Sequence, residues 1–167
     1  MEEGGAVATQ RGAVLIAGLV FLLLLTLLAT SSMQNATLQE KMAGSQAARD
    51  ASFQAAESTL RLGEALIRSP GFSQARCPSP VACLPPPEAM TLTEAARGAS
   101  GVVWAARPNG LLGIQYLGEI EDVVGGQALE RPQKLYRVTA IGLQGTSRTV
   151  LESLHTEAQR IMWRQRL

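Results

Sequence analysis

The chain offers few side chains that could do chemistry, and they are scattered along its 167 residues. Its single histidine, His155, has no serine–aspartate motif near it in sequence. An enzyme needs a nucleophile beside a base, a paired acid and base, or a cluster of metal ligands. Neither glycine pair, at 4–5 and 125–126, fits a phosphate-binding loop. The sequence therefore predicts a protein that is not an enzyme, with no catalytic residues, no bound metal and no cofactor.

Three acidic residues close together, Glu119, Glu121 and Asp122, are the densest group of potential oxygen ligands. Ordinary exposed charge explains them, and a calcium site is the alternative. With a net charge of +1 and no basic patch interleaved with aromatic residues, the chain has no feature typical of nucleic-acid binding.

Two cysteines, Cys77 and Cys83, lie six positions apart in a proline-rich stretch at 72–90. In an oxidising compartment such a pair forms a disulfide that closes the loop. Unpaired thiols remain an alternative, as does a metal site, for which only His155 could serve as a further soft ligand. A thioredoxin-like redox role would need C-x-x-C, which this spacing does not match.

The element that must position everything else is the N-terminal apolar run. Residues 12–39 carry no charge, between Arg11 and Glu40. As a helix this stretch would be about 42 Å long, enough to cross the hydrocarbon core of a bilayer. The run is compatible with a cleaved secretory signal, cut near Ser31, and with a plain signal anchor. A third interpretation rests on Gly12, which abuts the apolar run with no spacer.

The residues after Gly12 favour the third interpretation. The pieces RGA-LI, FLLLLTLL, SSMQ, TLQEKMAG and FQAAE, all within residues 11–64, closely resemble the N-terminal region of the PilX family of type IV pilus minor pilins. The resemblance implies a class III signal that prepilin peptidase cuts between Gly12 and Ala13, after which Ala13 is N-methylated. It covers about a third of the chain.

Ala17 departs from the general pilin pattern, in which the fifth mature residue is a glutamate that pairs with the amine of a neighbouring subunit. A carboxylate in a membrane is costly unless it is paired, so a subunit without it needs no neighbour above it. We therefore expect placement at the pilus tip, similar to the K-type pseudopilins of type II secretion. The alternative is that this glutamate is dispensable in minor subunits.

Apolar positions recur at helical spacing beyond the anchor, and Pro70-Gly71 is a stop signal. We expect residues 30–50 to pack poorly on a domain and 53–67 to pack well. The charged side chains of 50–68 would form a solvated face with the pairs Glu57–Arg61 and Glu64–Arg68, and contact with adjacent subunits is the alternative.

The rest of the chain is expected to form a small α+β head. Thr91–Glu94 predicts a capping box that opens a helix to Arg97. Strands are expected at 102–105, 111–124, 134–143 and 147–156, with turns at Asn109-Gly110, 125–126 and 144–146. The segment 157–167 is helix-prone and basic, and we expect a frayed polar tail, with contact to a membrane or a partner as the alternative.

The fold class is thus a type IV pilin-like lollipop, a long helix packed on an antiparallel sheet of three or four strands. The expected organisation is a leader at 1–12, an anchor at 13–32, an amphipathic helix at 33–69, a head at 70–156 and a tail at 157–167.

The resemblance implies a minor pilin of the bacterial inner membrane with a periplasmic head, which later joins the pilus. Its expected partners are other minor pilins, the major pilin, prepilin peptidase and the assembly platform, with a tip adhesin as a further candidate. Two alternatives stand: a K-type-like pseudopilin of a secretion system, although that type has a larger head, and a soluble periplasmic binding domain released by signal peptidase.

Overall fold

The computed structural model describes residues 10–122 and 128–166, and these described residues fall into two compact units that divide between Ser45 and Gln46. One helix, α1 (Gln10–Ile67), contributes to both units. In the first unit every residue from Gly12 onward is exposed. The hydroxyls of Thr26 and Thr30 donate to the carbonyls of Leu23 and Leu27, at 2.8 and 3.0 Å. Hydroxyls satisfied within the helix suit an apolar environment.

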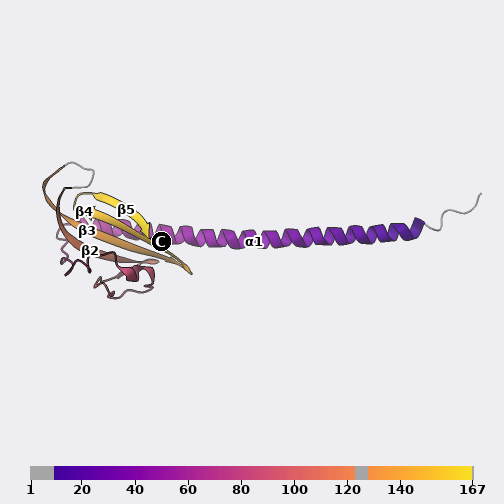
Figure 1. Ribbon diagram of the computed structural model, residues 1–167, viewed down its shortest axis with the longest axis horizontal. Coiled ribbons are helices and arrows are strands. Elements are labelled where there is room, and N and C mark those ends of the chain that lie inside the picture. The colour runs from indigo at the N-terminus through magenta and orange to yellow at the C-terminus, as the bar shows by residue number, and fades with distance from the viewer. Residues whose placement is uncertain (1–9, 123–127, 167) are drawn as a thin grey trace, which may run out of the picture. The chain divides into compact units, whose positions relative to one another are not determined.

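The second unit is a five-stranded antiparallel sheet in the order β1-β2-β3-β4-β5, so each strand lies beside its neighbour in the chain (Figure 1). The strands are β1 (Ala105–Arg107), β2 (Gly110–Asp122), β3 (Ala128–Gln144), β4 (Ser147–Thr156) and β5 (Arg160–Arg166). Asn109 and Gly145 turn the chain between β1 and β2 and between β3 and β4, both with positive φ, 53° and 56°. These turns confirm the expected hairpins.

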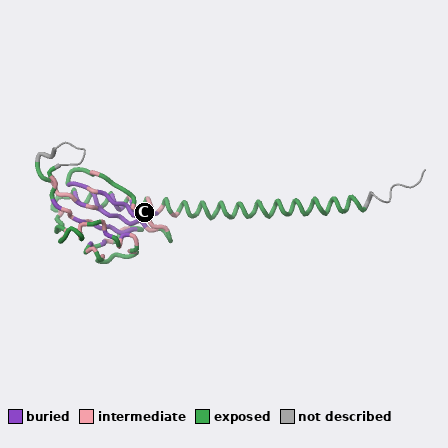
Figure 2. The backbone as a smooth tube through the Cα atoms, in the orientation of Figure 1, coloured by how far each residue is buried: buried purple, intermediate pink, exposed green. Residues whose placement is uncertain are grey.

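Both faces of the sheet are covered. On one face α1 contributes Ala56, Leu60 and Ile67 to a core with sheet residues such as Val138 and Leu151. On the other face the segment that precedes β1 contributes Ala89 and Trp104 to a second core. The burial pattern in Figure 2 matches this arrangement, with purple concentrated in the central strands. The predicted packing of 53–67 is confirmed, and so is the poor packing expected of 30–50, where all residues are exposed except the half-buried Ala48.

The helix expected at 91–97 is absent from this described segment, and that prediction was wrong. A short 3₁₀ helix, η1 (Pro87–Met90), stands earlier, with a proline in its first turn. Proline favours that position because its missing N–H would be unpaired there. Thr91 does not cap a following helix, since its hydroxyl donates backward to the Glu88 carbonyl at 3.3 Å.

Three strand predictions also need correction, and one is the strand expected at 134–143, which is β3 and begins at Ala128. The sheet has five strands instead of three or four, because residues 160–166 form β5 and are neither a helix nor a frayed tail. The strand expected at 102–105 begins only at Ala105. The prediction of β4 at 147–156 is confirmed, α1 ends at Ile67, and the break expected at 125–126 lies outside the described residues.

Candidate functional site

The apolar part of α1 is the first candidate site. Over the described chain, α1 is the one helix long and apolar enough to cross a membrane, and that part has no buried residue within the structure. Gly12, Ala13 and Ala17 lie in its first turns, all exposed. A Cβ added to Gly12 would meet nothing within 4 Å. The surface of this segment is therefore available to lipid or to other chains.

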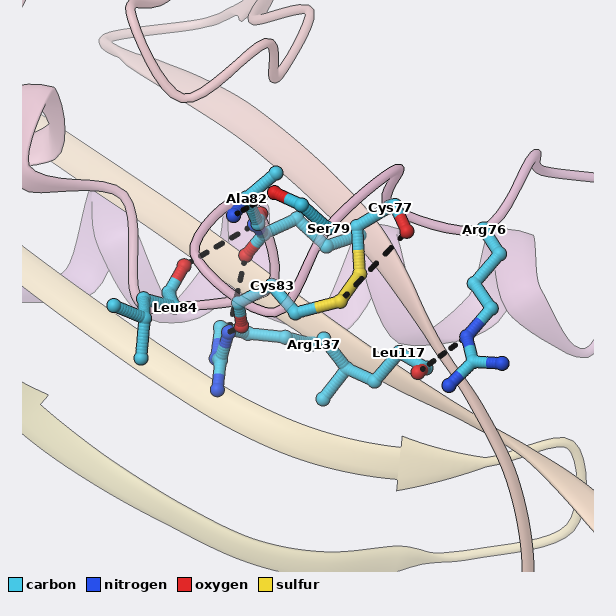
Figure 3. The surroundings of a disulfide bond; sticks show 9 residues. Arg76, Cys77, Ser79, Ala82, Cys83, Leu84, Leu117 and Arg137 are labelled. Carbon is cyan, nitrogen blue, oxygen red and sulfur yellow. Dashed lines mark hydrogen bonds between the residues drawn. A yellow bond between two sulfur atoms is a disulfide. The ribbon is translucent and has the colours of Figure 1, made fainter.

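The second candidate site is the loop closed by the disulfide between Cys77 and Cys83, whose Cα atoms are 5.4 Å apart (Figure 3). The predicted disulfide is confirmed, and the two cysteines are the only ones in the chain. Inside the loop the Ser79 side-chain oxygen accepts from the Ala82 amide at 3.2 Å, and the Ser79 carbonyl accepts from the Cys83 amide at 3.1 Å. Such bonds are typical of a tight turn formed by a short covalent ring.

Side chains of the sheet hold this loop from the Cys83 end. Gln115 of β2 donates to the Ala82 carbonyl at 2.7 Å and to the Leu84 carbonyl at 3.2 Å. Arg137 of β3 donates to the Cys83 carbonyl, as Figure 3 shows. Charge-assisted bonds to carbonyls are stronger than neutral ones. The loop is therefore fixed on the sheet, and its exposed apolar side chains, Val81 and Leu84, face solvent.

Arg137 also belongs to a charged cluster around Glu152, whose side chain is only 3% exposed. Arg137 and Arg164 both donate to Oε1 of Glu152, each at 3.1 Å. The Arg166 guanidinium lies 4.0 Å from Oε2 of the same carboxylate. Burial is the largest effect on Arg137 and lowers its pKa, against the opposing charge of Glu152. One buried carboxylate thus joins three strands through three arginines, with an excess of positive charge.

A second buried pair joins α1 to β5. Glu64, 4% exposed, accepts two hydrogen bonds from Arg160 at 2.8 and 2.6 Å. Burial alone would raise the pKa of Glu64, but the Arg160 hydrogen bonds and charge lower the pKa below its ordinary value. The expected pair Glu64–Arg68 is therefore wrong, because Glu64 faces the sheet, whereas the expected pair Glu57–Arg61 is present at 2.5 Å.

His155 lies beside this second pair and is 1% exposed on β4. Its Nδ1 contacts the Thr156 carbonyl, and Arg68 Nη1 lies 3.2 Å from its Nε2. Burial, together with the charges of Arg68 and Arg160, lowers the pKa of His155. No nucleophile accompanies it among these contacts, and the geometry is that of a buried structural side chain.

The acidic group of β2 gathers no further ligands. Glu119 and Glu121 are exposed, and the side chain of Asp122 lies outside the described residues. Within residues 10–122 and 128–166, no three side chains of His, Cys, Asp or Glu are placed to hold a metal ion.

Sequence reasoning missed Glu152 as the centre of a charged cluster. One signal was available: Glu152 is the only acidic residue in the predicted strand 147–156, and it directly follows the apolar pair Val150 and Leu151. A charge in such a position is rarely buried without a partner. The partners, Arg137, Arg164 and Arg166, lie at sequence separations that give no local signal.

One comparison with known proteins identifies the N-terminal segment. Residues 11–61, about a third of the chain, match the family model described as PilX N-terminal. No curated protein and no solved structure matches the chain. The match begins one residue before Gly12 and ends in the part of α1 that packs on the sheet. The chain therefore carries, over residues 11–61, the N-terminal domain of the PilX family of type IV pilus minor pilins.

Proposed function

We propose that this protein is a minor pilin, a structural subunit that enters the assembly of a type IV pilus together with other minor pilins. The observation that carries the proposal is the match of residues 11–61 to the PilX N-terminal model, on a helix whose apolar part has no cover within the structure. The anchor lies first in lipid and then among neighbouring helices of the filament, so both environments cover the same exposed leucines.

The proposed processing site is the bond between Gly12 and Ala13, which prepilin peptidase cuts at the cytoplasmic surface of the inner membrane. Two features support it: Gly12 offers an unhindered backbone, and it directly precedes the apolar run. The cut removes residues 1–12, leaves the helix attached and frees the Ala13 amine for methylation. The disulfide between Cys77 and Cys83 fits a head that faces the oxidising periplasm.

Intact mass and N-terminal sequencing of the chain extracted from host membranes test this proposal. We expect a chain that begins with methylated Ala13. A matched variant pair, Gly12→Leu and Gly18→Leu, serves as the control, because neither glycine has a neighbour within 4 Å. The first should keep the leader, and the second should lose it. A wild-type chain that begins near Ser32 would instead mean ordinary signal peptidase and a soluble periplasmic domain.

We also propose placement at the pilus tip, in a priming complex that makes contact with the major pilin, the assembly platform and, as a further candidate, an adhesin. Support comes from Ala17, an apolar residue where pilins generally carry glutamate. The variant Ala17→Glu introduces a carboxylate that needs the amine of a subunit above it. It should therefore move the subunit away from the tip, which immunogold labelling of sheared pili would show. Unchanged incorporation and unchanged labelling would refute the tip assignment and leave the pilin assignment intact.

A further inference from the structure

The two edges of the sheet differ in how far the chain itself covers them. At one edge β1 pairs with only three residues of β2, Gly110 to Leu112. Beyond Leu112, residues 74–77 donate hydrogen bonds to outward-facing carbonyls of β2. Gln74 donates to Ile114 at 3.1 Å, Cys77 to Tyr116 at 3.0 Å, and Arg76 to Leu117 at 3.2 Å. Figure 3 shows the last of these. This edge is largely closed.

The opposite edge is β5, seven residues from Arg160 to Arg166, paired only with β4 and with no described strand beyond it (Figure 1). In an antiparallel pair, alternate residues direct their N–H and C=O groups away from the partner strand. Natural edges are protected by proline, lysine, bulges or shortness. β5 contains no proline or lysine, and its one register shift lies at its start, opposite Leu154–His155.

The arginines of β5 are only partly available to protect its edge, because each lies against a buried carboxylate. Arg160 binds Glu64, and Arg164 and Arg166 lie against Glu152. Two large apolar residues are exposed along this edge, beside the polar Gln165 and Arg164: Met162 and Trp163, on opposite faces of the strand, are 40% and 49% exposed.

The charge on the Glu152 face is unbalanced. Three arginines surround a single carboxylate, and the Arg164 side chain is 49% exposed. Only one Arg164 nitrogen, Nη2, donates to Glu152, so its other donors are available to a second acceptor. A segment placed alongside β5 would bring a side chain directly opposite Arg164, on the same face.

A second copy of the chain is a poor occupant of this edge. In a symmetric antiparallel pair of β5 strands, every register with five or more residue pairs sets one arginine directly opposite another. When Trp163 pairs with Trp163 of the second copy, Arg160 pairs with Arg166. When Met162 pairs with itself, Arg160 pairs with Arg164, and in the third register Arg164 pairs with itself. Like charges at directly opposed positions disfavour such pairs.

We propose that β5 is a docking edge for an extended acidic segment of a partner protein, which joins the sheet as a sixth strand with a carboxylate opposite Arg164 and an apolar side chain beside Trp163. Backbone hydrogen bonds supply the affinity, and the alternating side chains supply the choice of partner. The proposal goes beyond the proposed function, which concerns α1, and does not depend on it.

Three synthetic eight-residue peptides test the docking edge on the full chain in detergent micelles. The first alternates glutamate and valine, the second alternates lysine and valine, and the third is the first with N-methyl groups on alternate amides. We expect only the first to bind, with added hydrogen-exchange protection confined to the amides of β5 and its neighbour. Equal binding of all three, no binding at millimolar concentration, or protection located elsewhere would each overturn the proposal.

A matched pair of variants separates this edge from general charge. Arg164→Gln keeps Glu152 in contact with Arg137 and Arg166, and should weaken binding of the glutamate peptide about fivefold, as loss of one half-exposed ion pair implies. Arg107→Gln removes the same charge from β1 at the opposite edge and should leave binding unchanged. Equal effects of the two variants would mean attraction by net charge alone, and would refute docking at β5.

Discussion

Helix α1 contains two regions that share a backbone and differ in what their side chains permit. From Gly12 to Ala47 all residues are exposed, and the large apolar ones are chiefly leucines. From Ser52 to Ile67 the buried face is built mostly from small or polar residues. Its members are Ser52, Ala56, Thr59, Leu60, Gly63, Glu64 and Ile67. The region that packs on the sheet is therefore the less hydrophobic of the two.

Close approach of backbones explains this difference. A Cβ on Gly63 would lie 2.5 Å from a Val138 methyl carbon and 2.7 Å from one of Leu112, too near for either. On the sheet, a Cβ on Gly142 would meet the backbone at Ser52 and Ala56. Small residues on both elements let helix and sheet interlock, and dispersion contacts then favour one fixed arrangement. The leucine-rich region has no such complement in the described chain and suits lipid or varied neighbours.

The largest expected effect comes from truncating a leucine in the region that packs on the sheet, with a leucine of the exposed region as the control. Leu60 is 2% exposed and belongs to the helix–sheet core, whereas Leu38 is 56% exposed. Leu60→Ala should lower the free energy of unfolding of the head by about 3 kcal/mol, because it removes buried surface and leaves a cavity. Denaturant titration of the full chain in micelles, followed by tryptophan fluorescence, measures this.

The matched variant Leu38→Ala should leave that free energy unchanged, since Leu38 is exposed and belongs to neither hydrophobic core. If both variants destabilised the head equally, the contrast between the two regions of α1 would be false.

A glycine pair gives the next largest effect. Gly63→Ala should destabilise the head by about 2 kcal/mol, because the new methyl group forces Val138 or Leu112 out of position. Gly44→Ala is the control, with nothing within 4 Å of its Cβ position. Alanine there should leave head stability unchanged and favour the helix locally by about 1 kcal/mol. Circular dichroism and denaturant titration report both quantities, and a stable Gly63→Ala head would argue against the interlocked packing.

Much of this architecture could be predicted because its signals are local. Apolar periodicity located the packing half of α1, and a turn signal at Asn109-Gly110 together with alternation predicted β2, β3 and β4. The two cysteines predicted their own pairing. The charged contacts could not be predicted from the sequence, because the partners of Glu64 and Glu152 lie far along the chain or in a segment with no strand signal.

The C-terminal strand β5 could not be predicted from local sequence signals. Residues 160–166 have no turn signal and three arginines, which by composition favour a polar helix or tail. They form a strand because buried carboxylates at Glu64 and Glu152 receive those arginines. Such an arrangement depends on tertiary contacts, which can override intrinsic propensity.

Two ion pairs on the same helix sharpen the comparison further. Glu64 is buried and bound twice by Arg160, whereas the side chains of Glu57 and Arg61 are 42% and 69% exposed. Glu64→Gln should cost about 1.5 kcal/mol of unfolding free energy, because it weakens two charge-assisted hydrogen bonds in a buried site. Glu57→Gln should cost only about 0.3 kcal/mol. Equal losses in a parallel denaturant titration would show that burial does not distinguish the two pairs.

The smallest expected effect is a pH dependence that His155 imparts to the head. Its pKa in the folded chain is lowered below the ordinary value of 6.5 by burial and by Arg68 and Arg160. The unfolded chain therefore binds the proton more readily, so stability is complete above about pH 6.5 and declines as the pH falls below it. Glu64 has a lowered pKa as well, so its contribution is lost only at more acid pH, below 4.5.

Because His155 is the only histidine, unfolding free energies measured between pH 7.5 and 5.5 isolate its contribution. The decline should stay below about 1.4 kcal/mol per pH unit, the limit for one proton. His155→Gln should flatten the profile over this interval whatever its own stability, since glutamine does not titrate. A variant that kept the wild-type slope would mean that the pH dependence arises from groups other than the buried imidazole on β4.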